Sequence, residues 1–251
     1  MNQRARTPTE SRVEWPTIGL LIGFAVAWTA VIVAHRSLPW FASVALLALL
    51  GGFHMSLQHE LLHGHPTRWT RLNTALGFVP LPLYLPYVRY KDCHIAHHVN
   101  ELTHPLVDPE SFYLMPESWT EAGPARRRLL LANRTLAGRL TIGTVYAIAA
   151  FLVTELRLVA ANRRIASVWA LHLAGTAGLA WLVFGVADQP VWEYVVGFVV
   201  MGSSLTQLRA FAEHRAVDGT TRSAVAAASV TAASLCSRAR SGGSRRSAKI
   251  C

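Results

Sequence analysis

Two histidine-rich runs determine how this chain is interpreted: HELLHGH at residues 59–65 and HIAHH at residues 94–98. Together they hold six of the chain's eleven histidines. If both runs are helical, each presents its histidines on one face, because the spacings are i, i+4 in the first and i, i+3, i+4 in the second. A neutral imidazole nitrogen binds borderline metals such as iron and zinc near physiological pH. Two such faces brought together predict a metal site with five candidate ligands: His59, His63, His94, His97 and His98.

Composition indicates a polytopic membrane protein. Of the 251 residues, 52% are hydrophobic and 15% are charged, which is too apolar for an ordinary soluble domain. The net charge of +10 is concentrated at one end, because six of the 24 basic residues and no acidic residue follow Asp218. Residues 1–218 therefore carry 18 basic against 14 acidic side chains, an excess that membrane topology alone would produce. No nucleic-acid partner is expected, and the three irregularly spaced cysteines predict no disulfide framework.

The hydrophobic runs predict an all-α integral membrane fold. We expect about four transmembrane helices in two pairs, with a cytoplasmic helical cap that carries the histidine runs. Within residues 66–91, Pro80, Pro82 and Pro86 interrupt an apolar run, which excludes a regular spanning helix and indicates an interfacial or re-entrant segment. The apolar run at about 140–153 fits an interfacial helix or a short span, and the sequence does not decide between them. The four predicted spans, each near the length that a bilayer demands, are residues 17–34, 38–57, 165–187 and 191–208.

The basic residues predict which side of the membrane the histidines face. Residues 59–140 contain nine Lys or Arg, whereas the turn at Asp188 contains none. By the positive-inside rule, the histidine runs and both termini are expected in the cytoplasm. Two pairs of spans would return the chain to that side near residue 209, so that His214 faces the histidine runs.

The chain divides into three predicted regions. Residues 1–15 are expected to form a polar cytoplasmic tail, and residues 16–222 the membrane domain. From residue 223 onward, alanine, serine and basic residues dominate, without hydrophobic periodicity and without histidine. Residues 223–251 are therefore predicted to be disordered.

The first histidine run also matches a different kind of metal site. His59-Glu60-x-x-His63 is the HExxH pattern of zinc proteases, in which both histidines bind zinc and the glutamate is the general base. That scheme gives the second run no role, whereas two histidine groups at cytoplasmic helix ends favour a dinuclear iron site that activates dioxygen. In such a site Glu60 would orient a ligand imidazole. His65 lies off the face shared by His59 and His63, so it is expected to support a ligand or face solvent, and His104, before a proline, is expected to be structural.

On these residues the chain resembles the membrane fatty acid desaturase family. HxxxH at residues 59–63 is similar to the family's first histidine box, and HxxHH at residues 94–98 is similar to its second. Glu213-His214 looks like the isolated histidine that follows the last spanning helix in this family and ligates iron. The resemblance covers about residues 15–222.

The resemblance implies an oxygen-dependent oxidoreductase of lipid metabolism. A dinuclear iron centre would use dioxygen to remove two hydrogens from an acyl chain, with electrons from a ferredoxin or a similar protein. Residues 108–113 (DPESFY) are similar to a stretch in bacterial members, which implies a bacterial inner membrane. Carotenoid or alkane hydroxylases and ketolases share the scaffold and stay an alternative, as does the zinc protease. The implied iron ligands are His59, His63, His94, His97, His98 and His214.

The chain departs from the family pattern at its C-terminal end. The family carries a third box, another HxxHH, some tens of residues beyond the position of His214, and this sequence has no histidine after His214. We expect a shift of reading frame near residues 222–226 or a truncation there. Without the third box, one iron would be bound weakly or not at all, and the desaturase activity would be impaired. A non-enzymatic membrane protein with residual metal affinity is the remaining alternative.

Overall fold

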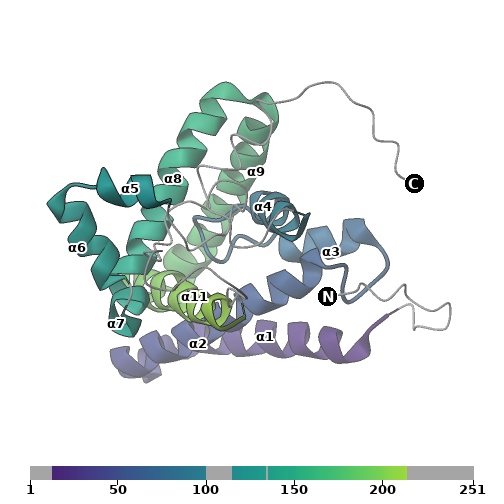
Figure 1. Cartoon of the computed structure of the whole chain (residues 1–251). Helices are drawn as coiled ribbons and strands as arrows, with labels where there is room; N and C mark the ends of the chain where they lie inside the picture. The colour runs from purple at the N-terminus through teal and green to yellow at the C-terminus, as the bar shows by residue number, and fades with distance from the viewer. Residues whose placement is uncertain (1–12, 100–114, 134, 214–251) are drawn as a thin grey trace, which may run out of the picture.

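The computed structural model describes residues 13–99, 115–133 and 135–213, and within these ranges the regular secondary structure is helical apart from one bridge between Val13 and Thr67. Figure 1 shows α1 along α2, α8 along α9, and α4 between the two groups. The elements are α1 (Trp15–Ala34), η1 (His35–Ser37), α2 (Trp40–Leu62), α3 (Thr70–Gly77), α4 (Tyr87–Val99), α5 (Pro116–Thr120), α6 (Pro124–Ala132), α7 (Leu136–Gly138), η2 (Arg139–Gly143), α8 (Thr144–Ala161), α9 (Arg163–Ala180), η3 (Trp181–Val186), α10 (Val191–Tyr194), η4 (Val195–Met201) and α11 (Gly202–Glu213).

Four helices are long and apolar enough to cross a membrane, which confirms the predicted fold class. Three of them, Trp15–Ser37, Trp40–Leu62 and Arg163–Val186, coincide with predicted spans. The fourth is Leu136–Ala161, which combines α7, η2 and α8. Its 26 residues show that the run at about 140–153 belongs to a helix of spanning length.

The predicted span at residues 191–208 is helical but is not one of these four. It consists of α10, η4 and α11, which follow one another without a break. Glu193, Ser203 and Ser204 make this helix more polar, and all three side chains are buried. The helix packs along α2, so its polar groups lie against protein.

Prolines lie at the starts of α1 and α2, and a polar turn connects the two helices. Pro16 lies in the first turn of α1 and Pro39 is the N-cap of α2, where a missing backbone N–H costs no helix hydrogen bond. In the turn between them, Arg36 Nη2 donates to Asp188 Oδ2 at 2.5 Å. This contact places the α1–α2 turn beside the turn that precedes α10.

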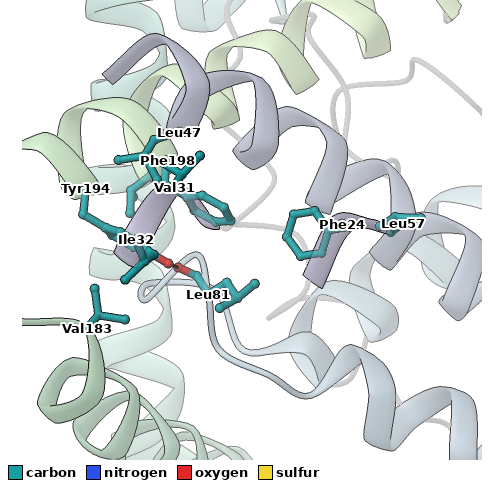
Figure 2. Close-up of a cluster of buried hydrophobic side chains, with 10 residues drawn as sticks. Phe24, Val31, Ile32, Leu47, Leu57, Leu81, Val183, Tyr194 and Phe198 are labelled. Atoms are coloured by element: carbon teal, nitrogen blue, oxygen red, sulfur yellow. Dashed lines mark hydrogen bonds between the residues drawn. The ribbon is translucent and has the colours of Figure 1, made fainter. Parts of the chain in front are cut away.

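Glycines let α2 and the η4–α11 helix approach each other closely. A Cβ at Gly202 would lie 2.7 Å from the Cα of Gly51, and a Cβ at Gly197 would lie 2.7 Å from the carbonyl oxygen of Val44. Both separations are below any ordinary contact with a Cβ, so the backbones meet with no side chain between them. Figure 2 shows the main apolar core. Its buried members are Phe24, Val31, Ile32, Leu47, Leu57, Leu81, Val183, Tyr194, Phe198 and Val199.

A proline-containing loop at residues 78–86 is buried among the helices. The prolines interrupt the helical hydrogen-bond pattern there, so the carbonyl groups that accept no backbone N–H need side-chain donors. Tyr194 donates its hydroxyl to the Leu81 carbonyl at 3.0 Å, as Figure 2 shows, and His172 Nε2 donates to the Leu83 carbonyl at 2.8 Å. Tyr84 Oη lies 3.1 Å from Ser203 Oγ. The loop is therefore held by α9, α10 and α11, and it leads directly into α4.

Candidate metal centre

Three histidines from two helices converge at one end of the bundle. His59 lies in the last turn of α2, His63 is the C-cap residue of that helix, and His94 is on α4. One ring nitrogen from each lies within 4.8 Å of the others. The ring centroids are 4.6 Å apart for His59 and His63, 4.7 Å for His59 and His94, and 5.1 Å for His63 and His94. The two histidine runs therefore meet, as the sequence predicted for these three members.

The shortest distance in this triad fits two ligands of one ion. His63 Nε2 and His94 Nε2 are 3.1 Å apart. Two nitrogens, each about 2.1 Å from a metal and at right angles to each other, would be about 3.0 Å apart. Three converging imidazole nitrogens are a donor set that suits zinc and iron. The described residues thus fit a metal ion, and they supply three of the six predicted ligands.

The end of α2 is anchored by buried contacts on the side of α3 and α4. Gln58, which precedes His59, donates its amide to the Gly77 carbonyl at 2.9 Å. Leu61 and Leu62 pack against Tyr87 of α4, forming a small apolar cluster. Burial raises the pKa of Tyr87 to about 12, in keeping with its position inside this cluster.

Glu60 and His65 lie outside the triad. Glu60 is exposed, and its Oε1 is 3.5 Å from Nδ1 of His59, a position from which it can orient that ring. His65 Nδ1 instead contacts the Glu14 carboxylate at 2.6 Å and 2.7 Å. Glu14 also donates its backbone N–H to the Pro66 carbonyl at 2.8 Å, which ties the loop after α2 to the start of α1.

Three predicted ligands are not placed by the described residues. His97 and His98 belong to α4, but their side chains lie outside the part that the structure describes. His214 follows the last described residue of α11 and lies outside as well, as do His104 and residues 108–113. Their predicted roles stay predictions.

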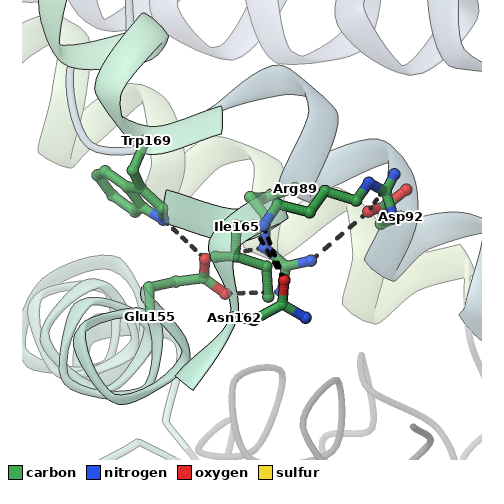
Figure 3. A network of polar contacts seen from close by, with 7 residues as sticks. Arg89, Asp92, Glu155, Asn162, Ile165 and Trp169 are labelled. Carbon is green, nitrogen blue, oxygen red and sulfur yellow. Dashed lines mark hydrogen bonds and ion pairs between the residues drawn. The ribbon is translucent and has the colours of Figure 1, made fainter. Parts of the chain in front are cut away.

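A buried ion-pair network next to α4 was not anticipated from the sequence. Arg89 of α4 donates through Nε and Nη2 to the two carboxylate oxygens of Glu155 in α8, both at 2.8 Å. Trp169 Nε1 of α9 donates to the same carboxylate at 2.8 Å (Figure 3). The available signal was Glu155 itself, a carboxylate within an apolar helix, which indicates a buried partner.

Comparison with protein families agrees with this arrangement. The chain matches the fatty acid desaturase family over residues 36–241, which include both histidine runs. The chain belongs to the fatty acid desaturase family. With the four apolar helices, this membership indicates a membrane protein. The match continues past residue 222, where the resemblance was expected to end. No curated protein and no solved structure gives a significant match.

Proposed function

We propose that this member of the family is a membrane oxidoreductase whose histidines hold a dinuclear iron centre and whose substrate is a lipid acyl chain. The observation that carries the proposal is the meeting of His59 and His63 with His94, a residue from the second histidine run. A zinc protease built on His59-Glu60-x-x-His63 needs one further ligand, which His94 or an acid could supply, but it gives His97 and His98 no role. The match to the desaturase family therefore supports the desaturase-type centre over the protease.

Contacts within and around the histidine triad favour the binding of a cation. Because His63 Nε2 and His94 Nε2 are 3.1 Å apart, one of them must be unprotonated when they share a hydrogen bond. His94 is 4% exposed, so packing restricts the orientation of its ring, and one of its nitrogens lies close to those of the two α2 histidines. Glu60 orients the ring of His59, whose Nδ1 is 3.5 Å from the carboxylate.

Bound iron would supply the dioxygen chemistry: an acyl CH₂–CH₂ unit loses two hydrogens and forms a C=C bond, while O₂, two electrons and two protons become two waters. The electrons would come from a ferredoxin or a similar protein. The contribution of the chain itself is to hold the ligands and to keep the site dry on the α2 side, where Leu61, Leu62 and Tyr87 are buried.

The proposal extends to orientation and to the reading frame of the gene. The histidine runs and both termini face the cytoplasm of a bacterial cell, which the nine basic residues within 59–140 support. The change of composition after residue 222 and the lack of histidine within residues 215–251 support a shift of reading frame near residues 222–226. Sequencing the gene tests this part: a histidine box in another reading frame beyond residues 222–226 supports it, and the lack of one contradicts it.

The central experiment measures iron and zinc per chain in detergent-purified protein. We expect iron in the unaltered chain and its loss in His63→Ala and His94→Ala. The matched control is His35→Ala, because His35 lies in the α1–α2 turn, at the other end of α2. Stoichiometric zinc that survives His94→Ala would support the protease instead, and no metal in the unaltered chain would refute the centre. Lipid analysis of expressing cells then separates a desaturated product from a hydroxylated or oxidised one.

A further inference from the structure

We propose that the buried Arg89–Glu155 ion pair is a positioning element for the metal centre. It fixes the rotation of α4 about its own axis and thereby keeps His94 directed at the histidines of α2. The inference rests on the proposed metal-binding function, and it adds residues from α8 and α9 that carry no metal ligand themselves.

The geometry of the ion pair restricts the orientation of both side chains. Arg89 and Glu155 are each 2% exposed, and the guanidinium and carboxylate form two parallel hydrogen bonds of 2.8 Å (Figure 3). A bidentate pair of this kind fixes the plane and direction of both groups. The indole N–H of Trp169 fixes the carboxylate from a third helix at 2.8 Å. Asp92 extends the network, 3.6 Å from Arg89 and 3.4 Å from Arg164 of α9.

Arg89 and His94 lie on different faces of α4. They are five residues apart, which is about 140° around a helix of 3.6 residues per turn. Tyr87 and Tyr90, seven and four residues before His94, lie on the His94 side. Tyr87 packs against Leu61 and Leu62 of α2, and Tyr90 has its ring centroid 5.8 Å from that of His94. Thus α4 contacts α2 with one face, while Arg89 holds another face to α8 and Asp92 pairs with Arg164 of α9.

A small rotation of α4 would be enough to dismantle the triad. A side-chain atom at the edge of a helix lies about 6 Å from its axis, so a rotation of about 20° would move it by about 2 Å. Metal–ligand distances tolerate only about 0.2 Å. Buried ion pairs contribute little net stability compared with apolar residues of the same volume, so directional control is the effect that this pair supplies.

The test compares Arg89→Lys, which keeps the charge but loses the fork, with Arg36→Lys. Arg36 is the matched control because it also pairs with an acid, Asp188, but the two side chains are 72% and 69% exposed and lie at the other end of α2. Each purified protein is titrated with Co²⁺ against a chelator, and the visible spectrum of the bound Co²⁺ and the thermal midpoint are recorded. We expect Arg89→Lys to raise the Kd for Co²⁺ by about tenfold or more and to change the spectrum, and Arg36→Lys to do neither.

Trp169→Phe is the second variant, in case Arg89→Lys does not fold. It removes the indole N–H that fixes Glu155 and keeps an aromatic ring at that position, and we expect it to raise the Co²⁺ Kd by about threefold with a smaller spectral change. A lowered thermal midpoint with unchanged Co²⁺ affinity and spectrum in these variants would overturn the positioning role and leave the ion pair purely structural. If the unaltered chain binds no Co²⁺, the proposed metal centre itself fails. The two failures are therefore distinct.

Discussion

A methyl group added at Gly202 should force α11 away from α2. The Cβ of Gly202→Ala would lie 2.7 Å from the Cα of Gly51, 2.8 Å from the Gly51 carbonyl carbon and 3.1 Å from the Gly52 nitrogen. All three neighbours are backbone atoms of a helix, so no side-chain rotation can relieve the contact. Restoring an ordinary separation of about 3.4 Å requires the helices to part by about 0.7 Å.

Such a displacement opens a contact that belongs to the core. Overpacking of this kind typically costs about 1–3 kcal/mol. Alanine is also the better helix former, by up to about 1 kcal/mol, so the measured effect is the difference between the two terms. A matched control isolates the contact: Gly23 is in α1, and a Cβ there meets nothing within 4 Å. Gly23→Ala gains the same propensity without the clash.

The assay is unfolding of both variants and the unaltered protein in one detergent, followed by intrinsic fluorescence. We expect the midpoint of Gly202→Ala to fall clearly below that of the unaltered protein, and the midpoint of Gly23→Ala to be equal to it or higher. If the two alanine variants have the same midpoint, the close approach of Gly202 and Gly51 does not exist in solution, and the reasoning is refuted.

Two further changes test the buried loop and the end of α4. Tyr194→Phe removes the hydroxyl that donates to the Leu81 carbonyl at 3.0 Å and leaves a buried acceptor without this donor, so the free energy of unfolding should fall by about 1–3 kcal/mol; an unfolding midpoint equal to that of the unaltered protein would contradict this. Tyr87 has a pKa raised by burial from 10.0 to about 12, so the folded protein keeps a proton that the unfolded chain releases. The contribution of the buried phenol to the free energy of unfolding is complete below pH 10 and is lost as the pH rises towards 12. Between pH 9, 10 and 11 the unfolding midpoint should therefore fall less steeply for Tyr87→Phe than for the unaltered protein. Parallel slopes for the two proteins would count against burial of the phenol.

The positions of most helical segments and the face of each helix on which its histidines lie could be predicted from the sequence, because they depend on local spacing. His59 and His63 share a face since they are one turn apart, and this is a property of the helix alone. The prolines at 80, 82 and 86 interrupt the backbone hydrogen bonds wherever the segment lies, so the break before α4 was predictable too. The sequence was insufficient for the run at about 140–153, because its apolar part is short enough to fit an interfacial helix as well as a span. Only the structure shows that this run belongs to the 26-residue helix Leu136–Ala161 and that Glu155 within it pairs with Arg89, 66 residues away.

The tertiary structure decided the choices that rest on contacts between distant residues. In the folded chain His94 contacts His63, 31 residues away in the sequence, whereas His65 contacts Glu14, 51 residues away. His94 and His65 have different partners although each belongs to one of the two runs from which the metal site was predicted. It also showed that the helix at residues 191–213 is held against α2 by the Gly51–Gly202 contact. Periodicity gives the face of a helix on which a residue lies. Which neighbour covers that face is decided by shape and by pairing of buried polar groups, and these exist only when the helices have assembled.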